Sequence, residues 1–178
     1  MKAILLDRDE TLNHDPGYMK NPDDMNLIKH VPEGLRMLKD AGFTLFILTN
    51  QSGIGRGIIL PEELEAVNAR LLSLLERENI FIKKIYICPH TDEEKCNCRK
   101  PLPGLVEQAI KENQINPEES FIIGDRHRDI LCAQNAGIKG ILINSKDSGP
   151  RPSNFIYHAT DMKDAASYIL KHIKNETI

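Results

Sequence analysis

The sequence has none of the features that mark nucleic-acid-binding, membrane or secreted proteins. Its 23 Lys and Arg stand against 26 Asp and Glu, a net charge of −3, whereas proteins that bind phosphate backbones usually carry a basic excess. It contains no apolar run near the roughly 20 residues that a membrane span needs. The apolar stretch at residues 1–6 is too short for a signal peptide and runs directly into charged residues. We therefore expect a cytoplasmic protein with no nucleic-acid or membrane partner.

Cysteine is also scarce. Four cysteines in 178 residues are too few for a scaffold held together by disulfides. Three of them, Cys88, Cys96 and Cys98, cluster with His90, which in a reducing compartment indicates metal ligation more readily than disulfides. Cys132 stands alone within an apolar stretch, where a small buried core residue is the expected role.

Short apolar runs alternate with amphipathic stretches along the whole chain, and hydrophobic residues make up 40% of it. Strands that are apolar on both faces and separated by helices are typical of a parallel sheet covered on both sides. The length fits one domain, and no linker or repeat divides it. We expect a single α/β domain over residues 1–178, a Rossmann-like, doubly wound parallel sheet. The expected strands are 2–6, 43–48, 84–87, 121–123, 140–143 and 155–157, and the expected helices are 32–41, 61–78, 105–113, 129–136 and 162–173.

Polar residues follow four of these strands. Ligands of such sheets bind at the carboxyl ends of the strands, where these residues would meet. Any one group alone is an ordinary polar loop or helix cap, but three carboxylates, a hydroxyl and an ammonium converging on one rim are hard to explain by capping. The segments are Asp7-Arg8-Asp9-Glu10-Thr11, Thr49-Asn50-Gln51-Ser52-Gly53, Arg99-Lys100-Pro101, and Gly124-Asp125-Arg126 with Asp129.

The groups on this rim suit phosphate chemistry. Asp7 and Asp9 leave the first strand two residues apart, and carboxylates that close need a cation, for which oxygen ligands favour Mg²⁺. Asp125 can add a further carboxylate. A carboxylate can attack phosphorus, the Thr49 hydroxyl with neighbouring N–H groups can hold phosphoryl oxygens, and Lys100 can neutralise charge.

In this order, D-x-D-x-T, an apolar strand ending in Thr, a Lys and G-D-x-x-x-D resemble the haloacid dehalogenase-like phosphohydrolases over nearly the whole chain. The resemblance implies that Asp7 is the nucleophile, and that Asp9 is the general acid that then activates water. Thr49 and Lys100 would bind the transferring phosphoryl group. Mg²⁺ would be held by Asp7, the backbone carbonyl of Asp9, and Asp125, with Asp129 supporting the site.

The cysteine cluster has the spacing C-x-H, five residues, C-x-C. Cys88, His90, Cys96 and Cys98 match a tetrahedral Cys₃His zinc set within one loop, 88–98, and four protein ligands make such a zinc structural. Free thiols or a redox pair are the alternatives. The loop runs straight into Arg99 and Lys100, so its expected role is to fix these two cations over the site.

The extended motif C-P-H-x5-C-x-C-R-K-P resembles the branch of histidinol-phosphate and heptose-bisphosphate phosphatases, which lacks a large cap domain. Two loops, Asp15-Pro16-Gly17-Tyr18 and Asn50-Gln51-Ser52-Gly53-Ile54-Gly55-Arg56-Gly57, resemble those of the D-glycero-D-manno-heptose 1,7-bisphosphate enzymes. The short zinc spacer and Gly124-Asp125-Arg126 instead resemble the histidinol-phosphate enzymes. We give more weight to the loops because they would touch substrate. The expected activity is removal of the 7-phosphate by a monomer. The substrate-binding residues implied are Asp15, Pro16, Gly17, Tyr18, Thr49, Asn50, Gln51, Ser52, Arg56, Arg99, Lys100 and Arg126.

Glu10 departs from the pattern of this branch, which usually has Gly there. Gly permits backbone angles that Glu adopts only at a cost, and a carboxylate beside the nucleophile could repel a phosphate dianion. We expect either that Glu10 points away from the site or that activity is altered. The alternative function to a phosphatase is then a weakly catalytic protein that binds a phosphorylated sugar.

Overall fold

A computed structural model of the chain describes residues 1–145, 149 and 151–175. These residues form a six-stranded sheet in the order β3-β2-β1-β4-β5-β6, and every neighbouring pair is parallel. The strands are β1 (Ala3–Leu6), β2 (Thr44–Asn50), β3 (Ile82–Cys88), β4 (Phe121–Gly124), β5 (Lys139–Ile143) and β6 (Phe155–Ala159). The six predicted strands are therefore all present.

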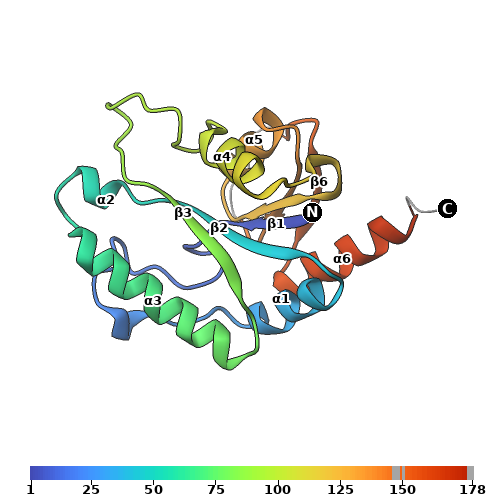
Figure 1. Cartoon of the computed structure of the whole chain (residues 1–178), viewed down its shortest axis with the longest axis horizontal. Helices are drawn as coiled ribbons and strands as arrows, with labels where there is room; N and C mark the ends of the chain where they lie inside the picture. Colours follow the sequence, from blue (N-terminus) through green and yellow to red (C-terminus); the bar gives the residue numbers. More distant parts are fainter. Residues whose placement is uncertain (146–148, 150, 176–178) are drawn as a thin grey trace.

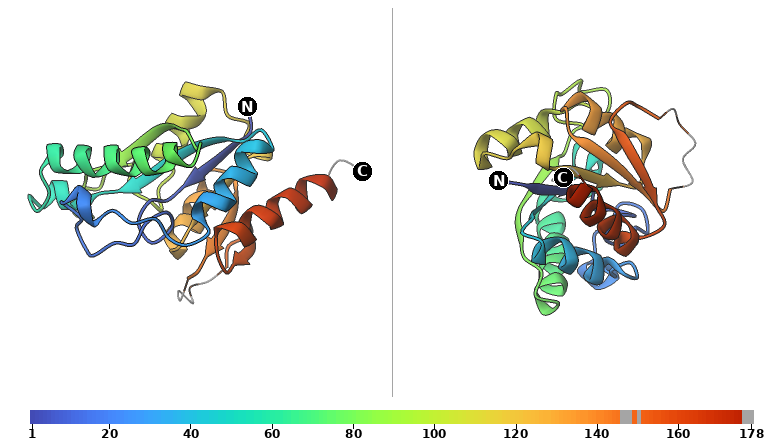
Figure 2. Two further views of the ribbon diagram at one scale, coloured as in Figure 1. Left: turned by 90° about the horizontal axis from the view of Figure 1, so that it is seen from below. Right: turned by 90° about the vertical axis from the view of Figure 1, so that its right-hand side faces the viewer.

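Helices cover both faces of the sheet (Figures 1 and 2). In Figure 1, α4 (Gly104–Asn113) and α5 (His127–Asn135) lie above it, whereas α1 (Val31–Asp40), α3 (Pro61–Arg77) and α6 (Met162–Asn175) lie below. The remaining helical segments are short: α2 (Ser52–Gly55) and the 3-10 turns η1 (Pro22–Asp24) and η2 (Pro117–Glu119).

Two apolar clusters fill the space on either side of the sheet. Successive side chains of a strand point to opposite faces, so Ile4 and Leu6 join the cluster under α1, α3 and α6, whereas Ala3 and Leu5 join the one under α4 and α5. All four residues of β1 are fully buried. The doubly wound parallel architecture predicted from the sequence is confirmed.

The strand order reverses direction beside β1, which lies between β2 and β4. The chain connections leave these central strands toward opposite edges of the sheet, which opens a crevice at their carboxyl ends. Two local predictions differ there. The helix predicted to start at residue 129 begins at His127, because the Asp129 side chain accepts a hydrogen bond from the Arg126 N–H and completes the first turn. The short α2 was not predicted, because two glycines weaken its helical pattern.

No helix in the described ranges is long and apolar enough to cross a membrane. The prediction that residues 1–178 form a single domain also covers residues outside those ranges, and it stays a prediction.

Candidate active site

One buried cluster joins the ends of β1 and β4 to the loop after β3. Oxygens of Asp7, Asp125 and Asp129 all lie within 4.8 Å of one another. The Lys100 ammonium lies among them, 2.6 Å from Asp7 Oδ1 and 2.7 Å from Asp129 Oδ1, and donates to the Leu48 carbonyl at 2.8 Å. The Lys100 side chain is 1% exposed. Three parts of the sequence that lie far apart, at Asp7, at Lys100 and at Asp125 with Asp129, are thus brought together.

Gly124 explains part of this convergence. A Cβ at that position would overlap the Asp129 side chain, so only glycine lets the first turn of α5 fold back against the end of β4. The Asp129 carboxylate then lies over the strand end and accepts from the Arg126 N–H at 3.1 Å. The G-D-x-x-x-D spacing is therefore dictated by local packing as well as by chemistry.

The cluster holds more negative than positive charge. Burial raises the pKa of Asp7 to about 7, aided by Asp129 and Asp9 and opposed by Lys100. Burial, together with Asp129, raises the pKa of Asp125 to about 6. Burial acts to lower the pKa of Lys100, but Asp129 and Asp7 outweigh it and hold that pKa above its ordinary value. Three buried carboxylates against one ammonium fit a site for a divalent cation with oxygen ligands.

Asp9 is held apart from this cluster. Arg8 forms a two-pronged ion pair with it, Nε to Oδ1 at 2.9 Å and Nη2 to Oδ2 at 3.0 Å. Gln51 Nε2 donates to Asp9 Oδ2 at 2.8 Å and to Thr49 Oγ1 at 2.8 Å, and Asn13 Nδ2 donates to Asp9 Oδ1 at 3.2 Å. The sequence did not single out Arg8 or Asn13, because nothing in the pattern shows that an arginine directly after a strand turns inward.

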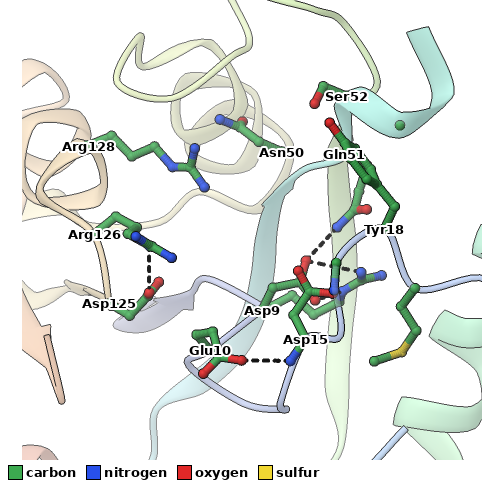
Figure 3. Close-up of a pocket in the computed structure, with 14 residues that line it drawn as sticks. Asp9, Glu10, Asp15, Tyr18, Asn50, Gln51, Ser52, Asp125, Arg126 and Arg128 are labelled. Carbon is green, nitrogen blue, oxygen red and sulfur yellow. Dashed lines mark hydrogen bonds and ion pairs between the residues drawn. The ribbon is translucent and has the colours of Figure 1, made fainter. Parts of the chain in front are cut away.

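A cavity of about 200 Å³ opens above Asp9 (Figure 3). Arg126 and Arg128 lie on one side of it, and Asp15 and Tyr18 lie on the other. Predicted substrate-binding residues that line it are Asp15, Gly17, Tyr18, Asn50, Gln51, Ser52 and Arg126. Thr49 and Lys100 are buried beside it, whereas Pro16, Arg56 and Arg99 are not among its lining residues.

Arg128 was missed by sequence reasoning. Its guanidinium makes no hydrogen bond or ion pair within the described part of the chain, whereas Arg126 Nε pairs with Asp125 Oδ2 at 2.9 Å. Arg99, in contrast, is committed to the cysteine loop through Asp92 and the His90 carbonyl. The cations available to a ligand in this cavity therefore come from the start of α5. A positive residue in the turn after G-D was the only sequence signal for Arg128.

Glu10 adopts the left-handed backbone conformation that its position was expected to require, with φ of 57°. Its Oε1 accepts a hydrogen bond from the Asp15 N–H at 2.7 Å, and Asp15 Oδ1 accepts from the Gly17 N–H at 3.0 Å (Figure 3). Burial, and the neighbouring Asp9, raise the pKa of Asp15. Glu10 therefore anchors the loop over residues 15–18 along the wall of the cavity.

The cysteine loop brings its four predicted ligands together. Cys88 Sγ lies 3.6 Å from Cys96 Sγ and 3.7 Å from His90 Nδ1, and Cys98 Sγ lies 3.5 Å from Cys96 Sγ and 3.3 Å from His90 Nδ1. Zinc–sulfur bonds of about 2.3 Å imply tetrahedron edges of about 3.8 Å, close to these separations. Burial acts to raise the pKa of Cys96, but hydrogen bonds with Cys98 and Cys88 lower it to about 7. The donor set fits zinc.

Asn50 links this loop to the sheet. Its side chain donates to the Lys100 carbonyl at 3.1 Å and accepts from the Lys100 N–H at 3.1 Å. The loop thereby presents the Lys100 ammonium to Asp7 from a backbone fixed at both ends, by Asn50 on β2 and by the cysteine cluster.

Comparison with known proteins places this geometry among phosphatases. Residues 97–173 match the model of the HAD-hydrolase-like family. The D-glycero-β-D-manno-heptose-1,7-bisphosphate 7-phosphatase of Haemophilus ducreyi is 41% identical over 78% of this chain and 80% of its own length. The enzyme of that name from Helicobacter pylori strain 26695 is 39% identical over 94% of this chain and 97% of its own.

A solved structure shares the fold over almost the whole chain. It is the D,D-heptose 1,7-bisphosphate phosphatase from B. bronchiseptica in complex with magnesium and phosphate, which is 28% identical and covers 97% of this chain and 99% of its own, with a TM-score of 0.88.

Proposed function

The chain belongs to the haloacid dehalogenase-like phosphatases, in the family of the D-glycero-β-D-manno-heptose-1,7-bisphosphate 7-phosphatases, and from this premise we propose that it removes the 7-phosphate of that sugar bisphosphate. The observation that carries the proposal is the buried cluster of Asp7, Asp125, Asp129 and Lys100 at the ends of β1 and β4. It supplies a nucleophile, cation ligands and a fixed ammonium at one point.

In the first step, an oxygen of Asp7 attacks phosphorus and forms an aspartyl-phosphate, while the bond from phosphorus to the sugar oxygen breaks. Asp9 transfers a proton to that oxygen, so the sugar leaves as an alcohol. In the second step, Asp9 takes a proton from water as the water attacks phosphorus. The bond to Asp7 then breaks, inorganic phosphate leaves, and the carboxylate is restored.

Lys100 and Thr49 hold the transferring phosphoryl oxygens. The Lys100 ammonium lies 2.6 Å from Asp7 Oδ1, so its charge is in place both for the nucleophile and for the phosphoryl group that Asp7 accepts. The Thr49 hydroxyl is buried beside it and is bonded to Gln51, which also bonds Asp9. The acid is thus linked to the Thr49 hydroxyl through Gln51, and the nucleophile is bonded to Lys100.

Asp7, Asp125 and Asp129, with the backbone carbonyl of Asp9, are the groups that would hold Mg²⁺. When bound, Mg²⁺ neutralises the charge of a phosphoryl group and of the carboxylate that attacks it. The Cys₃His cluster would hold a structural Zn²⁺, since its four ligands complete a tetrahedron and leave no position for substrate. Its part in the activity is to hold the backbone that leads into Lys100.

The second phosphate of the substrate lies against Arg126 and Arg128. Both line the cavity from the side opposite Asp15 and Tyr18, and both carry the charge that a phosphate needs. The carboxylate of Asp15 and the amides of Asn50 and Gln51 face the same space and suit the sugar hydroxyls. Arg126 and Arg128 therefore give the cavity a cationic side that suits the second phosphate of a bisphosphorylated sugar.

Phosphate release with Mg²⁺ from D-glycero-β-D-manno-heptose 1,7-bisphosphate and from histidinol phosphate tests the proposal. We expect a kcat/KM at least about a hundredfold higher on the heptose compound, with the 7-phosphate lost and the 1-phosphate kept in the ³¹P spectrum. Release only from histidinol phosphate would overturn the substrate. Binding of the sugar bisphosphate without release from either compound would favour a phosphosugar-binding protein.

A further inference from the structure

Arg8 is a buried arginine whose three guanidinium nitrogens each donate a hydrogen bond. Its side chain is 1% exposed. Nε and Nη2 bind the two oxygens of Asp9, and Nη1 donates to Asn68 Oδ1 at 2.9 Å. A guanidinium is planar, so fixing Nη1 at one end also fixes the plane in which the other two donors meet the carboxylate. The orientation of Asp9 therefore depends on Asn68.

Asn68 is out of place in its own helix. The other buried residues of α3 are apolar and face the sheet: Leu64, Val67, Leu71 and Leu75. An asparagine that is 7% exposed among them carries a desolvation cost, which its hydrogen bond to Arg8 offsets. α3 packs on the face of the sheet away from α5, so this bond ties the crevice to the opposite layer of the fold.

Gln51 completes the support of Asp9 from the other direction. It bridges Asp9 Oδ2 and the Thr49 hydroxyl, both at 2.8 Å. The Asp9 carboxylate is thus held between Arg8 and Gln51. Its position is fixed relative to the Thr49 hydroxyl, which would bind the phosphoryl oxygens. Proton transfer to a leaving oxygen requires such placement, because a misplacement of about 1 Å costs large factors in rate.

We propose that Arg8, braced by Asn68 of α3, is a positioning residue that fixes the Asp9 carboxylate for proton transfer to and from the reacting oxygens. This rests on the proposed function, in which Asp9 is the acid and then the base. Neither Arg8 nor Asn68 touches the reacting atoms, and both act through Asp9. Loss of the hydrogen bond between Arg8 and Asn68 should therefore lower the rates of only those steps in which a proton moves.

Substrates with different leaving groups distinguish this positioning role from a merely structural one. p-Nitrophenolate leaves without a proton, whereas a sugar alkoxide needs one. In Asn68→Leu, we expect the pre-steady-state burst of nitrophenolate from p-nitrophenyl phosphate to keep its rate within about threefold. The slow phase after the burst should fall, because hydrolysis of the phosphoenzyme needs the base. Turnover of the heptose bisphosphate should fall by about 10- to 100-fold.

Three further variants make the result decisive. Asp9→Asn sets the full size of the leaving-group effect. Asn68→Asp keeps an acceptor for Arg8 and should restore most of the heptose activity. Leu72→Ala, one turn along α3, perturbs the packing of the same helix without touching Arg8, and should reduce thermal stability while changing the activity on both substrates by the same factor.

The outcomes distinguish the two proposals. If Asn68→Leu slows the burst and the heptose turnover equally, as Leu72→Ala does, the positioning role is wrong while the proposed function stands. If Asp9→Asn itself shows no dependence on the leaving group, the proposed acid and base role fails. Where Asn68→Leu does not fold, Arg8→Lys serves in its place, because it keeps the charge and loses the two-pronged contact.

Discussion

The two ligand clusters of this molecule were built in opposite ways. The cysteine cluster takes all four groups from residues 88–98, within one loop, whereas the carboxylate cluster joins Asp7 to Asp125 and Asp129 from the ends of two neighbouring strands, β1 and β4. The first is partly exposed around a buried Cys88, and the second is buried at every ligand. A ligand site within one loop depends on spacing, while a site spread over several strands depends on the strand order that brings its parts together.

The largest effect is expected when the nucleophile is removed from the carboxylate cluster. Asp7→Asn should lower kcat by at least about 10⁴-fold, because an amide is a poor nucleophile and a weaker cation ligand. Phosphate release from the heptose bisphosphate measures this. Asp40→Asn, at the exposed end of α1, controls for the loss of one charge. Activity in Asp7→Asn close to that of the wild type would contradict nucleophilic attack by Asp7.

Disrupting the other cluster should have a smaller and different effect. Cys98→Ser should lose Zn²⁺ from the purified protein and lower kcat by about 10- to 100-fold, because the backbone that carries Lys100 loosens while every reacting group remains. Metal analysis and kinetics on the same sample measure this. Full activity in zinc-free protein would show that the loop does not support the site.

The pH dependence of Mg²⁺ binding tests the charge of the carboxylate cluster. The pKa values of Asp7 and Asp125 are raised to about 7 and about 6, so both must lose protons when a cation binds. Apparent Mg²⁺ affinity should weaken by up to about tenfold per pH unit between about pH 7 and about pH 6, and by up to about a hundredfold per unit below about pH 6, where two protons compete with the cation. Titration calorimetry in buffers from about pH 5.5 to about pH 8, a range that brackets both pKa values, measures this affinity.

Stability follows from the same shifts. A carboxyl whose pKa is higher in the folded state than in the unfolded state favours folding at low pH, and that advantage is lost as the pH rises through the folded pKa. Metal-free protein should therefore lose stability between about pH 4 and pH 7. Added Mg²⁺ should raise the melting temperature more at pH 8 than at pH 5.5, values chosen on either side of about 7. Equal shifts at both pH values would contradict the placement of the cation on these carboxylates.

Arg128 and Arg56 provide a smaller test, at the rim of the cavity. Arg128→Ala should raise KM for the bisphosphate by about three- to fivefold, the size expected of an exposed ion pair, with little change for a sugar monophosphate. Arg56→Ala should change neither, because Arg56 does not line the cavity. The reverse pattern would place the second phosphate at Arg56.

Glu10→Gly should have the smallest effect. Relief of the left-handed backbone at φ 57° is worth about 1 kcal/mol, and loss of the hydrogen bond to the Asp15 N–H costs about the same. Steady-state kinetics and thermal melts should both stay close to wild type, with kcat/KM within about threefold. A tenfold gain in activity would show that the Glu10 carboxylate repels the substrate.

Much of this molecule was predictable because its patterns are local. The apolar runs gave every strand of the sheet, and the spacing of Cys88, His90, Cys96 and Cys98 gave a cluster that the structure assembles. The buried ion pair of Arg8 was not predictable, since it depends on Asn68 arriving from a helix 60 residues away. The place of Arg128 beside the cavity depends on how separate segments pack, and the turn of Arg99 toward Asp92 depends on the path of the backbone within the cysteine loop.

The most direct test of the account is to find the phosphoryl group on the enzyme. Asp9→Asn mixed with p-nitrophenyl phosphate and Mg²⁺, acid-quenched within the first turnover and digested, should yield the peptide that contains Asp7 with the added mass of one phosphoryl group, because p-nitrophenolate leaves without a proton and hydrolysis then lacks its base. Asp7→Asn treated in the same way should yield none. Phosphate released at the wild-type rate, with no modified Asp7 in any quenched sample, would contradict the aspartyl-phosphate route and with it the role of the carboxylate cluster.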